Sequence, residues 1–217
     1  MGIAAIVPAA GRGERLGGGT PKALQLLCGE PVLHRAVAAL TGYVELIVVV
    51  APADHLDIVA GLPGAIRVVP GGATRRESVA AGLRALPADA DIVLVHDAAR
   101  PLVPGALVVA VIEAVRAGAD AVVPVLPVTD TVKSVDPQGR VTATLDRAGL
   151  VAVQTPQGFR RDVLVRAHAQ AGGIGTDDAS LVEALGVAVL TIPGHPAAFK
   201  ITTPYDVVLA ELLIGAG

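Results

Sequence analysis

The 217-residue sequence is poor in cysteine and in aromatic residues. Its single cysteine, Cys28, excludes a disulfide within the chain and a cysteine metal cluster. Aromatic residues make up 2% of the chain and tryptophan is missing, so we expect no platform of rings for base stacking. If the protein binds a nucleobase, backbone groups and small side chains must recognise it.

Long apolar runs and a strong net charge are also missing. Although 53% of the residues are hydrophobic, no run approaches the length of a membrane span. A net charge of −3 gives no sign of bulk affinity for nucleic acid. The N-terminus enters an apolar run at once, without the basic region and cleavage site of a signal peptide. With the single cysteine, this favours a cytoplasmic protein that binds neither membranes nor nucleic acid.

Short apolar runs alternate with segments of helical pattern along the chain. Runs rich in Val and Ile predict buried strands at 3–7, 44–50, 65–69, 91–96, 120–125 and 187–192. Helical patterns cover 31–41, 54–61, 74–86, 104–116, 160–171, 178–185 and 204–214. This alternation predicts an α/β fold, with one doubly wound, mostly parallel sheet in a single domain over residues 1–217. Ligands of such folds bind at the carboxyl ends of the strands.

Residues 127–151 interrupt this rhythm. Polar and apolar residues alternate over 129–135 and 140–145, and the segment 136–139 between them has the composition of a turn. We therefore expect a β-hairpin inserted into the domain. An isolated two-stranded hairpin is only marginally stable in water, so it must pack on something. A second subunit is the obvious partner, which predicts a homodimer with a β-arm.

The loop after the first strand suits a polyphosphate. Residues 8–22 contain five glycines and three cations, namely Arg12, Arg15 and Lys22. Glycines let backbone N–H groups approach a ligand, and the cations can pair with phosphate oxygens. The loop lacks the Gly-Lys-Ser/Thr of a P-loop, and Leu16 stands where the dinucleotide fingerprint needs glycine. We expect a nucleoside triphosphate here, and a dehydrogenase is disfavoured.

Asp97 follows the strand at 91–96, where a ligand is expected. It could hold Mg²⁺ or accept a substrate hydroxyl. Capping of the helix that begins near Pro104 is the structural alternative, but Asp97 lies too far upstream for it. Arg100 could pair with Asp97 or reach a phosphate, and the sequence leaves both open. We expect His96 to be a satisfied histidine near the core rather than a catalyst.

Two glycines, Gly71 and Gly72, precede the helix predicted at 74–86 and can form a second backbone-rich wall. Thr74 and Glu77 match a capping box, which is a sufficient structural explanation for both. Ser78 lies in the first turns of the helix and could hydrogen-bond to the edge of a base.

Three later segments allow more than one interpretation. Residues 154–157 are expected to form a rigid polar loop, and residues 175–179 fit a helix cap at least as well as a metal site. Lys200 is a single cation between apolar neighbours, in an exposed strand or in a site. The five histidines show no spacing typical of zinc ligands.

Taken together and in this order, the motifs resemble the 2-C-methyl-D-erythritol 4-phosphate cytidylyltransferases of non-mevalonate isoprenoid biosynthesis, within the sugar-phosphate nucleotidylyltransferases. The resemblance spans residues 3 to about 212. The segments that carry it are 8–15 with 21–22, 71–78, 96–101, 130–133, 146–147, 154–157, 176–179 and 200–202. The sequence departs from the family at Ala23, where glutamine is usual, and at Ala73, where an acidic residue is common.

The resemblance implies a Rossmann-like nucleotidyltransferase fold that transfers CMP from CTP to 2-C-methyl-D-erythritol 4-phosphate, with Mg²⁺ bridging the triphosphate oxygens. It assigns catalytic roles to Arg15, Lys22, Arg147 and Lys200. It assigns nucleotide binding to Pro8, Ala9, Ala10, Gly11, Gly13, Gly72, Arg75 and Ser78. It assigns acceptor-substrate binding to Asp97, Ala98, Arg100, Thr131 and Thr155, with Asp97 also the candidate metal ligand.

Two alternatives remain beside this interpretation. A sister enzyme that joins CTP to ribitol 5-phosphate would keep the nucleotide loop and change the hairpin and its surroundings. A non-catalytic nucleotide-binding protein of the same fold is the second. The joint presence of Arg15, Lys22, Asp97, Arg147 and Lys200 argues against it, because binding alone does not need all five.

Overall fold

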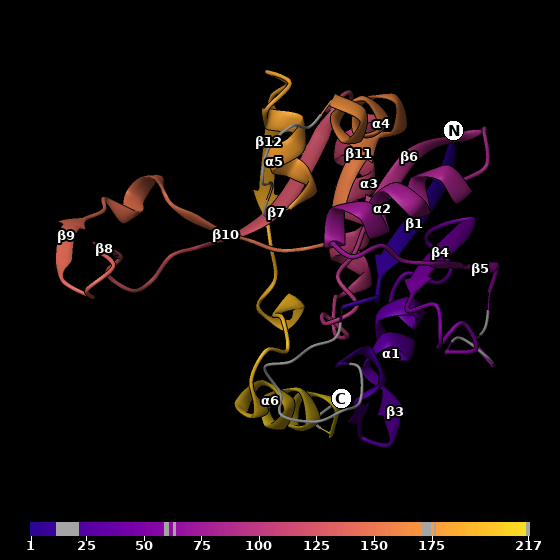
Figure 1. Ribbon diagram of the computed structural model, residues 1–217, viewed down its shortest axis with the longest axis horizontal. Coiled ribbons are helices and arrows are strands. Elements are labelled where there is room, and N and C mark those ends of the chain that lie inside the picture. The colour runs from indigo at the N-terminus through magenta and orange to yellow at the C-terminus, as the bar shows by residue number, and fades with distance from the viewer. Residues whose placement is uncertain (12–21, 59–60, 63, 171–174, 176, 216–217) are drawn as a thin grey trace.

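The computed structural model describes residues 1–11, 22–58, 61–62, 64–170, 175 and 177–215 (Figure 1). Eight strands of this described part form one sheet in the order β10-β7-β11-β6-β1-β4-β5, with β12 also paired to β7. Their bounds are β1 Gly2–Pro8, β4 Leu46–Ala51, β5 Ile66–Pro70, β6 Ala90–Val95, β7 Ala121–Pro127, β10 Val151–Val153, β11 Gln157–Arg160 and β12 Val189–Pro193.

The sheet is mostly parallel, as the sequence predicts. The pairs β1–β4, β1–β6, β4–β5 and β7–β12 are parallel, and β10 and β11 pair in antiparallel fashion. From β1 the chain adds β4 and β5 on one side and then returns to place β6 on the other. This reversal beside β1 is the switch point at which α/β sheets bind ligands.

Helices cover both faces of the sheet. The packing clusters place α1 (Val32–Ala38) and α3 (Gly105–Arg116) on one face and α2 (Arg75–Ala85), α4 (Arg161–Gln170) and α5 (Asp178–Glu183) on the other. The last helix, α6 (Pro204–Gly215), packs beside the short hairpin of β2 (Leu26–Leu27) and β3 (Glu30–Pro31). None of the helices in the described ranges has the length and hydropathy that crossing a membrane requires.

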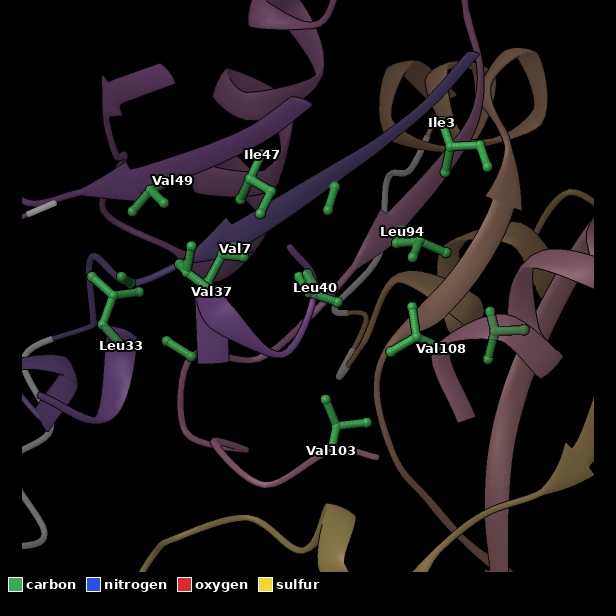
Figure 2. Packing of buried hydrophobic residues seen from close by; sticks show 14 of the residues in the cluster. Ile3, Val7, Leu33, Val37, Leu40, Ile47, Val49, Leu94, Val103 and Val108 are labelled. Atoms are coloured by element: carbon green, nitrogen blue, oxygen red, sulfur yellow. The ribbon is translucent and has the colours of Figure 1, made fainter. Parts of the chain in front are cut away.

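Strand β1 shows why these runs form central strands. Ile3, Ala5 and Val7 belong to the cluster under α1 and α3, of which Figure 2 shows a part. Ala4 and Ile6, which alternate with them, belong to the cluster under α2, α4 and α5. Successive side chains of a strand point to opposite faces, so a strand covered on both faces must be apolar at every position.

Two sequence predictions are wrong in detail. Residues 54–58 of the helix predicted at 54–61 form turns, and residues 59 and 60 lie outside the described part. Of this segment only Ile58 is buried among the described apolar residues, which is too little packing for so short a helix. Residues 154–157 are not wholly a loop either, because Gln157 begins β11, a buried antiparallel strand between β6 and β7.

The predicted β-hairpin is present. Strands β8 (Lys133–Val135) and β9 (Val141–Thr144) pair in antiparallel fashion, and Asp136 closes the turn by accepting from the N–H groups of Gln138 and Arg140. Gly139 in this turn has a φ of +80°, which glycine adopts without steric cost. Figure 1 shows the arm projecting away from the sheet and its helices.

Candidate functional site

A cavity lies at the carboxyl ends of β1, β5 and β6, beside the switch point. We call it the first cavity. The described residues that line it are Pro8, Ala9, Ala10, Gly11, Ala23, Gly72, Ala73, Thr74, Arg75, Ser78, Asp97, Ala98, Ala99 and Lys200. It thus brings together most of the nucleotide-binding residues expected from the sequence, with Asp97, Ala98 and Lys200. Gly13 and Arg15 lie outside the described residues, as does the side chain of Lys22, whose backbone belongs to the 3₁₀ turn Lys22–Leu24.

The two glycines after β5 allow the cavity wall to form. A Cβ atom on Gly71 would stand 2.9 Å from the hydroxyl oxygen of Ser78 and would overlap Ala10. The N–H of Gly71 donates to the carbonyl of Ala51 at 2.8 Å, which fixes the loop against β4. The loop after β5 therefore packs directly against the loop after β1, and only glycine fits between them.

The N-terminus of α2 is capped as predicted. The Thr74 hydroxyl accepts from the N–H of Glu77, and the Glu77 carboxylate accepts from the N–H of Thr74, both at 3.1 Å. One turn on, Ser78 is buried and donates its hydroxyl proton to the Thr74 carbonyl at 3.0 Å. The same hydroxyl accepts from the N–H of Gly72 at 3.3 Å. Because its proton is engaged, Ser78 can serve a ligand only as an acceptor.

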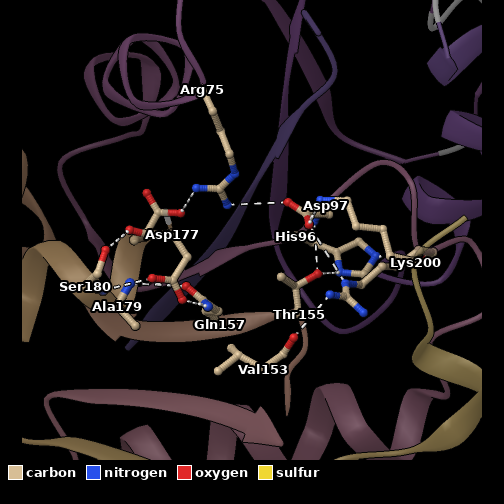
Figure 3. Close-up of polar contacts among 12 residues, drawn as sticks. Arg75, His96, Asp97, Val153, Thr155, Gln157, Asp177, Ala179, Ser180 and Lys200 are labelled. Atoms are coloured by element: carbon tan, nitrogen blue, oxygen red, sulfur yellow. Dashed lines mark hydrogen bonds and ion pairs between the residues drawn. The ribbon is translucent and has the colours of Figure 1, made fainter. Parts of the chain in front are cut away.

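Asp97 is the centre of an ion-pair network (Figure 3). Its carboxylate accepts from Lys200 Nζ at 2.8 Å and from Arg75 Nη2 at 3.4 Å. Burial by itself would raise the pKa of Asp97, but Arg75 and Lys200 outweigh it and lower the pKa to about 2. Asp97 is therefore ionised at neutral pH, and it holds two cations at the edge of the cavity.

Lys200 lies in a loop and not in a strand. The N–H of the next residue, Ile201, donates to the carbonyl of Ala99 at 2.8 Å and ties this loop to the one that carries Asp97. Beyond it, one carboxylate oxygen of Asp206 accepts from the backbone and hydroxyl groups of Thr202 and Thr203 at 2.7–2.9 Å. The segment that bears Lys200 is thus held on both sides.

Arg100 is committed mainly to the backbone. Its guanidinium donates to the carbonyl groups of Ala198 at 2.7 Å and Val153 at 3.2 Å, whereas Asp97 lies 3.9 Å away. Burial lowers the pKa of Arg100, although Asp97 opposes this. The structure thus favours a structural role for this arginine, which ties the loop after β6 to β10 and to the 3₁₀ turn Pro196–Ala198.

His96 is buried and satisfied, as expected. Its Nε2 lies 3.1 Å from the carbonyl of Arg100, and its Nδ1 lies 3.0 Å from the hydroxyl of Thr155. Burial lowers the pKa of His96 to about 4, so the ring is neutral at pH 7. The carbonyl requires N–H at Nε2, and Nδ1 then accepts the Thr155 proton. The Thr155 hydroxyl in turn accepts from the N–H of Asp97 at 3.0 Å.

A second cavity adjoins the first and shares Arg75, Asp97 and Lys200 with it. Its other lining residues are Arg100, Val153, Gln154, Thr155, Gln157, Asp177, Ser180 and Glu183. Gln157 donates to Asp177 at 2.6 Å, and Asp177 also accepts from the N–H of Ser180 as the N-cap of α5. Capping therefore accounts for Asp177. Thr176 lies outside the described residues.

The site contains one connection that the sequence did not reveal. Arg75 contacts both Asp97 and Asp178, which lie on different elements, and it lines both cavities. An arginine at the first residue of a helix carries no signal of its own. The sheet order, which brings α2 and α5 to the same face, could not be read from the sequence.

Two expected residues lie elsewhere. Thr131 and Arg147 belong to the arm and line neither cavity. The Arg147 guanidinium instead contacts the carbonyl of Thr129 within the arm. The arm extends away from the sheet that carries Asp97 (Figure 1), so this chain does not bring these two residues to its own cavities.

The described residues offer little to a metal ion. Nowhere in the described ranges do three or more His, Cys, Asp or Glu side chains gather as a metal site would require. Asp97 is the carboxylate nearest the shared edge of the cavities, and both of its oxygens pair with cations. A divalent ion at this place would therefore need most of its ligands from a bound substrate.

Comparison with known proteins identifies the family of the chain. Residues 3–216 match the family described as 2-C-methyl-D-erythritol 4-phosphate cytidylyltransferase. An enzyme of that name from Frankia casuarinae is 60% identical over 215 residues, with 98% of this chain and 81% of that protein covered. The Saccharopolyspora erythraea enzyme of that name is 54% identical, with 99% and 100% covered.

Solved structures show the same fold. The 2-C-methyl-D-erythritol 4-phosphate cytidylyltransferase from Thermus thermophilus superposes with a TM-score of 0.83 at 39% identity, with 98% of each chain covered. The 4-diphosphocytidyl-2C-methyl-D-erythritol synthase from Anaerococcus prevotii gives 0.85 at 29% identity, with 99% of this chain and 98% of that one covered. The chain therefore belongs to the 2-C-methyl-D-erythritol 4-phosphate cytidylyltransferase family and is a cytidylyltransferase.

Proposed function

We propose that each of the two cavities binds one of the two substrates of this enzyme, which transfers CMP from CTP to 2-C-methyl-D-erythritol 4-phosphate and releases pyrophosphate. The observation that carries the proposal is the pair of cavities that share Arg75, Asp97 and Lys200. Two phosphorylated substrates, one in each cavity, would meet at Arg75 and Lys200. Alignment of the reactants and neutralisation of their charge are the main demands of such a transfer.

The first cavity takes CTP in this proposal. Backbone groups of residues 8–11 and Gly72 hold the nucleotide, and Ser78 accepts a hydrogen bond from an N–H group of the base. Arg75 faces the phosphates. Arg15 and Lys22, from the loop after β1, stabilise the charge that develops on the α-phosphate in the transition state.

The second cavity takes the polyol phosphate. Its volume of about 430 Å³ suits a small molecule of this class. Lys200 positions the attacking phosphate, and Asp97, Arg100 and Thr155 form the surrounding wall, whereas Ala98 lines the adjoining first cavity. The nucleophile is a phosphate oxygen that is already ionised, so the reaction needs no general base. Thr155 can contribute only as an acceptor, because its proton is directed to His96.

Among the described residues, Asp97 would be the protein ligand of the Mg²⁺ that accompanies the triphosphate, since it lines both cavities. The ion would neutralise charge on the phosphate oxygens as the pyrophosphate departs. The residues of this chain bind and align the two substrates around it.

The arm completes the site of a second copy of the chain. It carries Thr131 and Arg147, and its strands expose Val135 and Val141, with Leu145 beyond them. The edge strand β10 exposes Val151 and Val153 beside its base. Several exposed apolar side chains on one arm and at its base favour an interface. A homodimer would cover them and bring Arg147 to the partner's second cavity. The cytoplasmic location expected from the sequence stays a prediction.

Release of pyrophosphate from CTP with a panel of polyol phosphates tests the proposed reaction. We expect pyrophosphate to be released much faster with 2-C-methyl-D-erythritol 4-phosphate than with ribitol 5-phosphate as the acceptor. We also expect faster release from CTP than from UTP, ATP or GTP, with UTP the best of these three donors. A site that recognises a base by hydrogen bonds strongly rejects another base whose edge has a different pattern of donors and acceptors. Equal turnover with ribitol 5-phosphate would favour the sister activity, and no turnover with any acceptor would favour a binding protein.

A further inference from the structure

A buried pair of side chains lies behind Arg75, on the side away from Asp97. Asp178 is 1% exposed at the start of α5, and the side chain of His168 is 5% exposed in the last turn of α4. Arg75 Nη1 donates to one oxygen of Asp178 at 2.7 Å, and His168 Nε2 lies 3.0 Å from the other. Three helices thus meet at one buried carboxylate.

The two carboxylates hold Arg75 unequally. The contact with Asp178 is 2.7 Å long and buried, whereas the contact with Asp97 is 3.4 Å long and lies at the edge of the cavities. A buried carboxylate needs a counter-charge, so Asp178 strongly favours keeping Arg75 in place. Asp97 already has Lys200 at 2.8 Å and depends less on Arg75. Asp178 therefore anchors one edge of the Arg75 guanidinium, and the other edge is directed toward the cavities.

Stability alone does not explain His168. Its buried Nδ1 has no hydrogen-bond partner among the described residues, and an unsatisfied buried polar atom costs about 1–3 kcal/mol. The other nitrogen occupies the Asp178 oxygen that Arg75 does not use. What the ring provides is a fixed orientation of the carboxylate toward Arg75.

We propose that Asp178 and His168 are positioning residues that hold Arg75 at the junction of the two cavities, ready to meet the triphosphate of CTP. The proposal rests on the proposed function for the role of Arg75. Without this anchor, Arg75 turns fully to Asp97, competes there with Lys200 and withdraws from the phosphates. Asp178 and His168 themselves touch no substrate.

Titration calorimetry with CTP and Mg²⁺ tests the anchor without turnover. We expect Asp178→Asn to weaken CTP binding about tenfold, which corresponds to the loss of one charge-assisted hydrogen bond. His168→Met should weaken it severalfold, and His168→Gln, which keeps a donor near Nε2, should restore most of the affinity. In the assay, the KM for CTP should rise more than kcat falls. Glu113→Gln, which breaks an exposed 2.7 Å pair with Arg116, should leave CTP binding unchanged.

A double-mutant cycle separates the anchor from a merely structural role. If Asp178 acts through Arg75, Asp178→Asn adds little to the loss of affinity in Arg75→Gln. Additive losses, or unchanged affinity in Asp178→Asn and His168→Met proteins that melt near the wild-type temperature, would overturn the proposal. If Asp178→Asn does not fold, the two His168 variants decide it, and equal affinity in both would overturn it. Wild-type protein that binds CTP but forms no product would refute the proposed reaction and leave this test intact.

Discussion

At the scale of single residues, neutral His96 fixes the direction of a hydroxyl group in the second cavity. The ring accepts the proton of Thr155 and donates to the carbonyl of Arg100, so a chain of hydrogen bonds runs from Asp97 through Thr155 and His96 to Arg100. Protonation of Nδ1 would reverse the bond to Thr155. The chain of hydrogen bonds therefore depends on the ring remaining neutral.

The low pKa of His96 predicts a pH-dependent stability. The ring titrates near 6.5 in the unfolded chain and near 4 in the folded protein, because burial disfavours the charge. Its contribution is fully present above pH 6.5 and falls by about 1.4 kcal/mol per pH unit as the pH drops toward 4. Urea unfolding from pH 7.5 to 4.5 should show a shallower loss of stability in His96→Gln than in wild type. His55→Gln, at a partly exposed histidine, is the control, and parallel curves for all three proteins would contradict this assignment.

Single residues could be predicted where their role depends on local sequence. The capping box of Thr74 and Glu77 and the buried state of His96 are confirmed because neighbouring residues decide them. Arg100 stayed open because its partners, the carbonyl groups of Val153 and Ala198, are remote in the sequence. The bridge of Arg75 to Asp178 was missed for the same reason.

At the scale of elements, strands with continuous apolar runs were predicted to within two residues at each end, whereas β11 was missed. Gln157–Arg160 is four residues long and starts and ends with a polar residue, so neither alternation nor an apolar run marks it. Its burial comes from long-range pairing with β6 and β7. The prediction of a helix at 54–61 is wrong for the opposite reason. The local pattern is helical, but the segment has little core to pack against.

The position of α2 depends on Gly82, which lies against the sheet. A Cβ at this position would stand 2.6 Å from Ile6 Cγ2 and 3.2 Å from Val50 Cγ2. We expect Gly82→Ala to cost about 1–3 kcal/mol through overpacking, despite the higher helix propensity of alanine. Because α2 also carries Arg75 and Ser78, CTP affinity should fall as well. Thermal melting checks this against Gly215→Ala, where the added Cβ meets no atom within 4 Å; equal melting temperatures would show that the contact is not tight.

At the scale of the whole molecule, the arm separates Arg147 from the cavities of its own chain. The hairpin was predictable from its alternation and turn. If the arm completes a second copy, the dimer has two equivalent shared sites.

Complementation tests this arrangement. We expect Arg147→Ala and Lys200→Ala each to be nearly inactive, since each removes a cation that positions a phosphate. In a mixed dimer, one site carries both lesions and the other is intact, so each mixed dimer should recover about half of wild-type activity. The two proteins are dissociated, mixed and reassociated. Absence of recovery, or a fully active monomer, would refute the shared site.

The central claim is that the two cavities are the donor and acceptor halves of one site that meet at Lys200. Steady-state kinetics with both substrates varied tests it most directly. We predict that Ser78→Ala raises the KM for CTP about tenfold and leaves that for 2-C-methyl-D-erythritol 4-phosphate unchanged, and that Thr155→Val does the reverse. Lys200→Gln should lower kcat by about 10²–10³. If Ser78→Ala and Thr155→Val raised both KM values alike, or Lys200→Gln kept near-normal kcat, the assignment of the two cavities would be contradicted.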